Sequence, residues 1–202
     1  MDTSEFRLFM KTIKLLILGL FCSLQMYAQK GVNQFAIQGG YEAFPHLNKA
    51  SGGNMGIEFK HYFDKRLFFV SNFHAGINNG DIDISYYQNG DLRDINLSNT
   101  QRDYMLGIGI GADVFQKNCH KIYVQSTVGL GSSTIRKDDF DMSSKTVDTV
   151  EENYVRYALS VSAGYDYRLT EWMAIGINYT GYQIGHSFDF KHSCNIKLSL
   201  LF

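Results

Sequence analysis

Residues 154–169 read Tyr-Val-Arg-Tyr-Ala-Leu-Ser-Val-Ser-Ala-Gly-Tyr-Asp-Tyr-Arg-Leu, and this stretch decides the fold. Its odd-numbered positions, from Val155 to Leu169, are all apolar or aromatic. Its even-numbered positions, from Arg156 to Arg168, are small, polar or charged. Successive side chains of a β-strand point to opposite faces, so this alternation indicates a strand whose two faces meet unlike surroundings.

The same alternation recurs along most of the chain. It is found at 34–42, 55–63, 67–77 (where it is weakest), 104–115, 122–131, 173–181 and 194–202, which makes eight predicted strands. Short connections at 64–66, 116–121 and 170–171 alternate with longer polar ones at 78–100, 134–152 and 183–190, and the link at 44–50 is intermediate in length. Short turns on one rim and long loops on the other are typical of an outer-membrane barrel.

The polar faces favour a barrel whose apolar side chains point outward to lipid. They are built mainly from glycine, alanine, serine and threonine with isolated charges, as at Gly107, Gly109, Ser160 and Ser162. Small side chains suit the narrow lumen of an eight-stranded barrel. A soluble lipocalin-like barrel, with an apolar interior and a polar surface, is the alternative.

Composition and charge exclude several classes of protein. The chain has 202 residues, the size of one domain, and its 45% hydrophobic content against 19% charged residues excludes disorder. The formal net charge of −1 gives no electrostatic reason to expect a nucleic-acid partner.

An export signal is predicted at residues 1–28, with the true start at Met10. Lys11 and Lys14 precede an apolar run at 15–24, and Ala28 follows as a cleavage-like small residue. A basic region, a short apolar region and a small residue describe a secretory signal peptide. Residues 29–202 then form a single barrel domain.

The pattern as a whole resembles the outer-membrane β-barrel domain family of Gram-negative bacteria, in the eight-stranded OmpA/OmpX-like size class. The resemblance is carried by the export signal, the eight alternating segments and the terminal strand that ends in Phe202. It implies an all-β, antiparallel, closed up-and-down barrel in the outer membrane. It also implies that Phe202 is part of the signal read by the barrel-assembly machinery, and that the chain contacts outer-membrane lipid.

Charged residues on the predicted inner face are the candidate site. We expect a structural salt-bridge network in the lumen, because an unpaired buried charge costs several kcal/mol. Its predicted members are Glu58, Lys60, Asp113, Arg156, Asp166, Arg168 and Lys197.

The expected role is non-enzymatic, with the loops at 78–100 and 134–152 as extracellular contact surfaces of a monomer. No catalytic residue, cofactor or metal is predicted; the aspartates at 81–94 and 138–141 lack the spacing of a calcium loop. One alternative is a lipid A deacylase-like enzyme using Gly185-His186-Ser187 and His192-Ser193, whose spacing departs from that family's motif. A small channel is the other, and the surface ligand stays open.

Overall fold

The chain forms eight long antiparallel strands. The computed structural model describes residues 32–43, 51–88, 91–141, 146–185 and 190–202, so the predicted signal peptide and the 44–50 link lie outside the described residues. The strands are β1 (Asn33–Ala43), β2 (Ser51–Tyr62), β3 (Leu67–Gln88), β4 (Asp91–Lys117), β5 (His120–Asp141), β6 (Thr146–Arg168), β7 (Met173–Ile184) and β8 (Lys191–Leu201).

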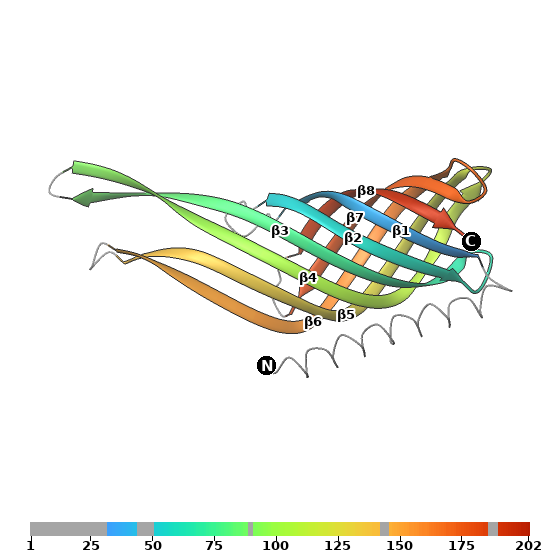
Figure 1. Ribbon diagram of the computed structural model, residues 1–202, viewed down its shortest axis with the longest axis horizontal. Helices are drawn as coiled ribbons and strands as arrows, with labels where there is room; N and C mark the ends of the chain where they lie inside the picture. Colours follow the sequence, from blue (N-terminus) through green and yellow to red (C-terminus); the bar gives the residue numbers. More distant parts are fainter. Residues whose placement is uncertain (1–31, 44–50, 89–90, 142–145, 186–189) are drawn as a thin grey trace, which may run out of the picture.

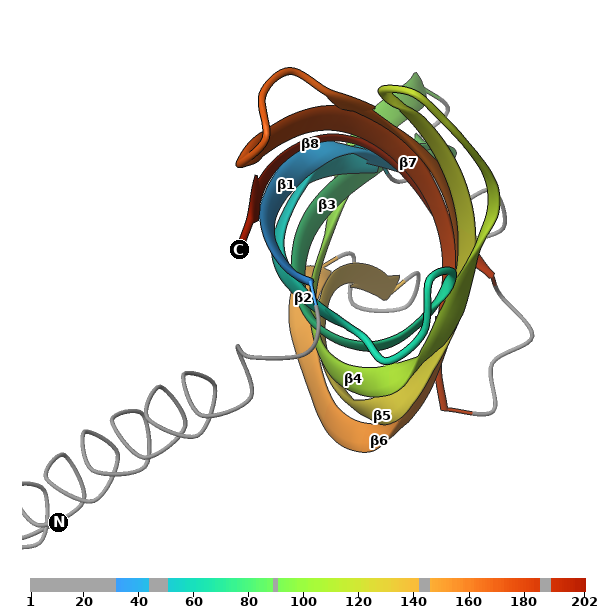
Figure 2. The same ribbon diagram turned by 90° about the vertical axis from the view of Figure 1, so that its right-hand side faces the viewer.

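These strands close into an up-and-down barrel. Each pairs antiparallel with its sequence neighbours, and β8 closes the ring by pairing with β1, from Gln34 opposite Leu201 to Ala43 opposite His192. Figure 2 looks into this ring, and Figure 1 shows it from the side. The predicted fold class, strand number and order are therefore confirmed.

The two faces of the wall have the predicted sense. On β4 the outward side chains of Leu106, Ile108 and Ile110 are 60–68% exposed. The inward-facing Lys60 and Lys197 are fully buried. The apolar band lies outside and the ionic side chains lie inside. Among the described residues, no helix is long and apolar enough to cross a membrane.

The prediction of loops at 78–100 and 134–152 is wrong, because most of these residues form β-strands. β3 and β4 stay paired up to Gln88 opposite Asp91, and β5 and β6 up to Asp141 opposite Thr146. The result is two long hairpins that extend well beyond the other strands (Figure 1). Polar residues on both faces of these extensions erase the alternation on which the prediction rested.

The opposite rim, here called the short-turn rim, has the tight connections that were predicted. Its turns lie at 63–66, 118–119 and 169–172. Asn118 has a φ of 54°, a left-handed conformation that asparagine tolerates better than most residues. A bulge between Asp113 and Phe115 leaves Val114 and Phe115 both exposed at this rim.

Glycines let bulky inner side chains and neighbouring backbones approach the wall. A Cβ on Gly111 would lie 2.4 Å from the Phe68 ring, so this glycine lets the ring lie directly against the wall. A Cβ on Gly109 would lie 1.9 Å from the backbone oxygen of Ser126 on β5. A larger residue would therefore require the Phe68 ring to move at Gly111 and the neighbouring strand to move at Gly109.

Candidate functional site

The half of the lumen nearer the short-turn rim contains three buried carboxylates and three ammonium groups. We call this group the ion cluster; it consists of Glu58 and Lys60 of β2, Asp113 of β4, Lys121 of β5, Asp166 of β6 and Lys197 of β8. Because the charges balance, the cluster is neutral when all six groups are ionised.

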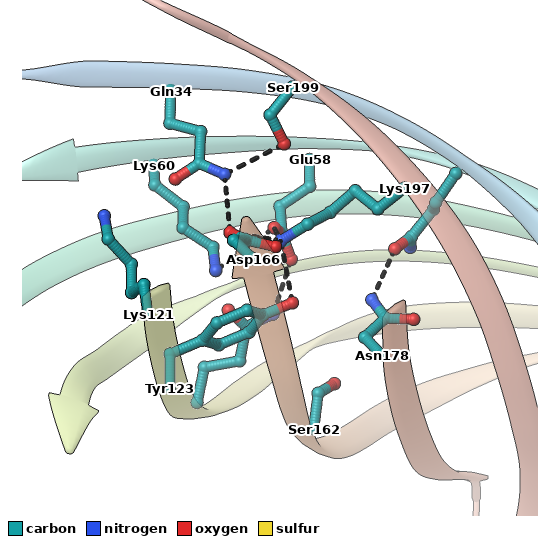
Figure 3. Close-up of polar contacts among 12 residues, drawn as sticks. Gln34, Glu58, Lys60, Lys121, Tyr123, Ser162, Asp166, Asn178, Lys197 and Ser199 are labelled. Carbon is teal, nitrogen blue, oxygen red and sulfur yellow. Dashed lines mark hydrogen bonds and ion pairs between the residues drawn. The ribbon is translucent and has the colours of Figure 1, made fainter. Parts of the chain in front are cut away.

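Lys197 is the centre of the ion cluster (Figure 3). Its Nζ lies 2.9 Å from Asp166 Oδ1 and 3.5 Å from Glu58 Oε1, and it donates to the Tyr123 hydroxyl at 2.8 Å. Gln34 Nε2 donates to the other oxygen of Asp166 at 3.0 Å. One ammonium group thus joins β2, β5, β6 and β8 across the lumen.

Lys60 occupies an aromatic site beside this centre. Its Nζ lies 3.3 Å from Glu58 Oε1 and 3.2 Å from the centroid of the Tyr123 ring. The Phe68 ring centroid is 4.6 Å from the same nitrogen. A desolvated ammonium over an aromatic face is stabilised by the ring quadrupole, so the aromatic rings supplement the one carboxylate.

The third ion pair lies closest to the short-turn rim. Lys121 Nζ is 3.3 Å from Asp113 Oδ2 and donates to the Tyr62 hydroxyl at 2.9 Å. The Tyr62 hydroxyl in turn lies 3.2 Å from Asp113 Oδ1 and donates to it. The rings of Tyr62, Phe68 and Tyr123 are buried beside the ion cluster in this half of the lumen.

A second buried group lies toward the hairpins, and we call it the upper cluster. It comprises Glu42 of β1, His74 of β3, Asp103 of β4, Tyr182 of β7 and Lys191 of β8. Glu42 accepts from the Tyr182 hydroxyl at 2.6 Å and lies 2.7 Å from His74 Nε2, and Lys191 donates to Asp103. Among the five, Glu42, Asp103 and Tyr182 have no exposed surface.

Between the two clusters the described lumen residues are polar but uncharged. Two hydroxyl pairs join adjacent strands, Thr127 with Ser160 at 2.6 Å and Ser162 with Thr180 at 2.8 Å, and an amide pair joins Asn178 of β7 to Gln38 of β1 at 2.6 Å. The lumen is therefore organised as two charged layers separated by a neutral polar layer.

Neither cluster has the arrangement of a hydrolytic site. His74 and Glu42 form a pair, but the hydrogen bonds found for them in the described part of the chain go to each other, Asn78 and Tyr182, with no serine, threonine or cysteine nucleophile among them. No cluster of three or more His, Cys, Asp or Glu side chains within the described residues is placed to hold a metal ion.

The described histidine–serine pair of the enzyme alternative does not form a hydrolytic arrangement either. His192 and Ser193 are consecutive strand residues, so their side chains point to opposite faces of β8. His192 lies 2.5 Å from the Tyr179 hydroxyl, whereas Ser193 is buried in the lumen. His186 and Ser187 lie outside the described residues.

The structure brings five of the seven predicted network residues together and leaves two apart. Glu58, Lys60, Asp113, Asp166 and Lys197 all belong to the ion cluster. Arg156 and Arg168 have the right parity, but both side chains are exposed, and no ion pair is found for either within the described residues. Arg156 lies before the β6–β7 pairing begins at Ala158, and Arg168 is the last residue of β6, so both lie at the ends of the enclosed part of the strand.

Sequence reasoning missed Lys121, Asp103 and Lys191. Lys121 has the inward parity of Tyr123 and Gln125, which was a usable signal, but it precedes the first alternating residue. Asp103 and Lys191 lie just beyond the predicted strand ends. Phe202 is 60% exposed and its backbone exchanges two hydrogen bonds with Asn33, so it closes the β1–β8 seam; its role in assembly stays a prediction.

The two hairpins contact each other near their tips. The rings of Tyr86 on β3 and Phe140 on β5 have centroids 4.9 Å apart. The Ser98 backbone N–H donates to the Asp138 carboxylate at 3.2 Å, at the point where β4 and β5 cease to pair. The two hairpins therefore no longer share a backbone ladder between β4 and β5, but side-chain contacts still join them.

The hairpin extensions carry a strong excess of negative charge. Residues 80–88 and 91–98 contain four carboxylates and one cation, and residues 136–141 and 146–155 contain six carboxylates and two cations. The short-turn rim is the reverse, because residues 63–66, 116–121 and 168–172 contain five cations and two carboxylates. The barrel thus presents an anionic end and a cationic end.

Comparisons with known proteins agree with this architecture. The family model of the outer membrane protein beta-barrel domain matches residues 15–202. No curated protein sequence matches the chain.

Solved structures of other barrels have a similar fold at low sequence identity. Ail of Yersinia pestis, solved with the heparin analogue sucrose octasulfate, is 10% identical with a TM-score of 0.52, and the alignment covers 86% of this chain and 99% of Ail. Neisserial surface protein A is 14% identical with a TM-score of 0.50, covering 84% and 95%. The outer membrane protease OmpT of Escherichia coli is 8% identical with a TM-score of 0.52, covering 85% and 97%.

Proposed function

This chain belongs to the outer-membrane protein β-barrel domain family and is an integral outer-membrane protein, and from that premise we propose that it is a non-enzymatic surface-contact protein. Its two long hairpins are the proposed contact surfaces. In barrels of this kind the short turns face the periplasm and the long connections face outward. The hairpins of this chain would therefore stand on the cell surface.

One observation carries the proposal: β3–β6 continue as exposed paired strands far beyond the other four. β3 and β4 pair for ten residues past Asn78, up to Gln88, whereas β2 ends at Ser51 opposite Asn79. A rigid wall that positions protruding segments is a common way to present a binding surface. The buried, neutralised lumen supplies the rigid wall.

The charge of the hairpins favours a cationic partner. Ail was solved with a polyanionic heparin analogue, but the hairpins of this chain carry ten carboxylates against three cations in their described residues. Like charges repel across an interface, so a sulfated glycan is disfavoured here.

A hairpin-trimmed variant tests the contact role. In it, residues 82–97 and residues 139–148 are each replaced by Asn-Gly, a dipeptide suited to a two-residue hairpin turn. We expect nanodiscs of the full chain to retain poly-L-lysine at low salt, heparin to be excluded, and the trimmed barrel to lose about tenfold in poly-L-lysine affinity. Equal binding by both barrels, or retention of heparin, would contradict the proposal.

Two further readouts separate this role from its rivals. Lipid A mass spectra of cells with and without the protein should be identical, and a lost or added acyl chain would instead support the enzyme alternative. Planar bilayers should show no conductance steps, because two layers of buried charged and aromatic side chains lie across the lumen. Conductance steps that survive hairpin trimming would support a channel.

A further inference from the structure

One margin of the protruding sheet lacks a neighbouring strand. β6 pairs with β5 along its whole length, up to Asp141 opposite Thr146, but its pairing with β7 begins only at Ala158 opposite Ile184. Within the described residues, no strand pairs with residues 147–155 on their β7 side. We call these residues the β6 edge.

The direction of the backbone groups on the β6 edge follows from two hydrogen bonds. Gly185 N donates to Tyr157 O on the β7 side, and Arg168 N donates to Cys119 O on the β5 side. Backbone groups of alternate strand residues point the same way, so odd-numbered residues of β6 face the edge and even-numbered ones face β5. The residues that direct both N–H and C=O to the β6 edge are therefore Val147, Thr149, Glu151, Asn153 and Val155.

A row of such groups is a template for one more strand. The other open margin, on β3, is shorter, because in the described part of the chain β3 lacks a β2 partner only over 80–88, whereas β6 lacks a β7 partner over 146–156. The β6 edge is also exposed on both sheet faces, apart from the half-buried Tyr154.

The side chains beside the β6 edge select the charge of that strand. Asp148 lies directly opposite Asp139 on β5, and like charges in such a cross-strand pair are destabilising. Glu152 lies on the same face of β6 as Asp148, with Lys137 as the cation of this face. A lysine or arginine on an added strand would relieve the repulsion between Asp148 and Asp139.

We propose that the β6 edge binds an extended cationic segment of a partner protein as an added β-strand, with basic side chains facing Asp148 and Glu152. This inference rests on the proposed contact role and names the chemistry of its partner. A second copy of this chain fits less well, because pairing two β6 edges would bring Asp148, Glu151 and Glu152 of both copies together.

Amide exchange of the full chain in nanodiscs gives the sharpest test. The probe is a peptide of alternating lysine and threonine, as long as the β6 edge, which places every lysine on one face of a strand. We expect its binding to slow exchange at Val147, Thr149, Glu151, Asn153 and Val155 by about tenfold or more, and to leave the even-numbered amides unchanged. Binding that leaves the odd-numbered amides unprotected would overturn the proposal.

A pair of variants tests the same edge by affinity. Thr149→Pro with Asn153→Pro removes two outward N–H donors without touching the ladder to β5, whereas Thr149→Ala with Asn153→Ala keeps the donors. We expect the proline pair to weaken peptide binding by about tenfold and the alanine pair to bind like the wild type. A glutamate–threonine peptide should not bind either form.

The outcomes separate this inference from the contact role. If the hairpin-trimmed barrel loses poly-L-lysine while the proline pair keeps the alternating peptide, the contact role stands and strand addition at the β6 edge is wrong. If trimming has no effect on poly-L-lysine, the contact role itself fails. A rise in oligomeric state at the expense of peptide binding would identify a second copy as the occupant and overturn the proposal.

Discussion

Replacing Lys197 with methionine is expected to lower the free energy of unfolding in lipid vesicles by about 3–5 kcal/mol. The Lys197 ammonium group has no exposed surface and contacts two carboxylates, Asp166 at 2.9 Å and Glu58 at 3.5 Å. Its removal leaves Asp166 buried without a cation and gives the ion cluster a net negative charge. Denaturant titration, followed by tryptophan fluorescence and gel mobility, measures the loss.

Two matched variants make this prediction specific to charge. Lys197→Met combined with Asp166→Asn restores neutrality and should recover most of the lost stability, since replacing both partners of a buried pair is often nearly neutral. Arg168→Met removes an exposed cation from the same end of the barrel and should cost less than about 0.5 kcal/mol. Equal losses from Lys197→Met and Arg168→Met would contradict the assignment of the ion cluster.

The second large effect is expected from adding a single methyl group to the wall. A Cβ on Gly129 would lie 1.9 Å from the backbone oxygen of Leu106 and 2.7 Å from the Cα of Gly107. Neither atom can rotate away, so Gly129→Ala has to separate β4 from β5, at a cost of about 1–3 kcal/mol or more.

A glycine with room for a methyl group supplies the control. A Cβ on Gly53 of β2 would approach no atom closer than 3.8 Å, an ordinary van der Waals distance. Gly53→Ala is therefore expected to fold with the yield and unfolding midpoint of the wild type. If Gly129→Ala has the same folding yield and unfolding midpoint as Gly53→Ala, the inference that β4 and β5 approach closely at Gly129 would be contradicted.

The part of the fold that sequence predicts best is the part that lipid constrains. Between residues 104 and 114, and again between 155 and 169, one face must be apolar and the other must be small or paired, so the alternation is strict. The same constraint indicated the inward face of Glu58, Lys60 and Asp166, because a charge on the lipid face is costly.

Beyond the membrane the strands no longer have to present an apolar face to lipid, and the alternation of apolar and polar residues ends there. Ile84 lies opposite Ile95 in the β3–β4 hairpin, but polar residues surround both, and the ladder continues without a period-2 signal. Asn89-Gly90, a strong hairpin signal, was available in the sequence and marks the centre of the predicted loop at 78–100.

The odd or even position of a residue in a strand predicts which face it lies on. It does not predict which inward-facing charges contact each other, because that depends on the geometry of the barrel. Strand tilt and stagger set the height of each residue in the lumen, so Lys197 of β8 meets Glu58 of β2 while Arg156, of equally suitable parity, does not. The sequence predicts the face on which such residues lie, whereas identifying their ion-pair partners requires the register between strands.

The apolar face of the barrel wall meets lipid, and the opposite face encloses the lumen. Nuclear Overhauser contacts between lipid acyl chains and methyl groups, recorded in nanodiscs, test it without mutation. Leu106 and Leu159 should show lipid contacts, and their chain neighbours Met105 and Ala158, which are at most 3% exposed, should show none. Lipid contacts at Met105 and Ala158, or water contacts at Leu106 and Leu159, would contradict the account.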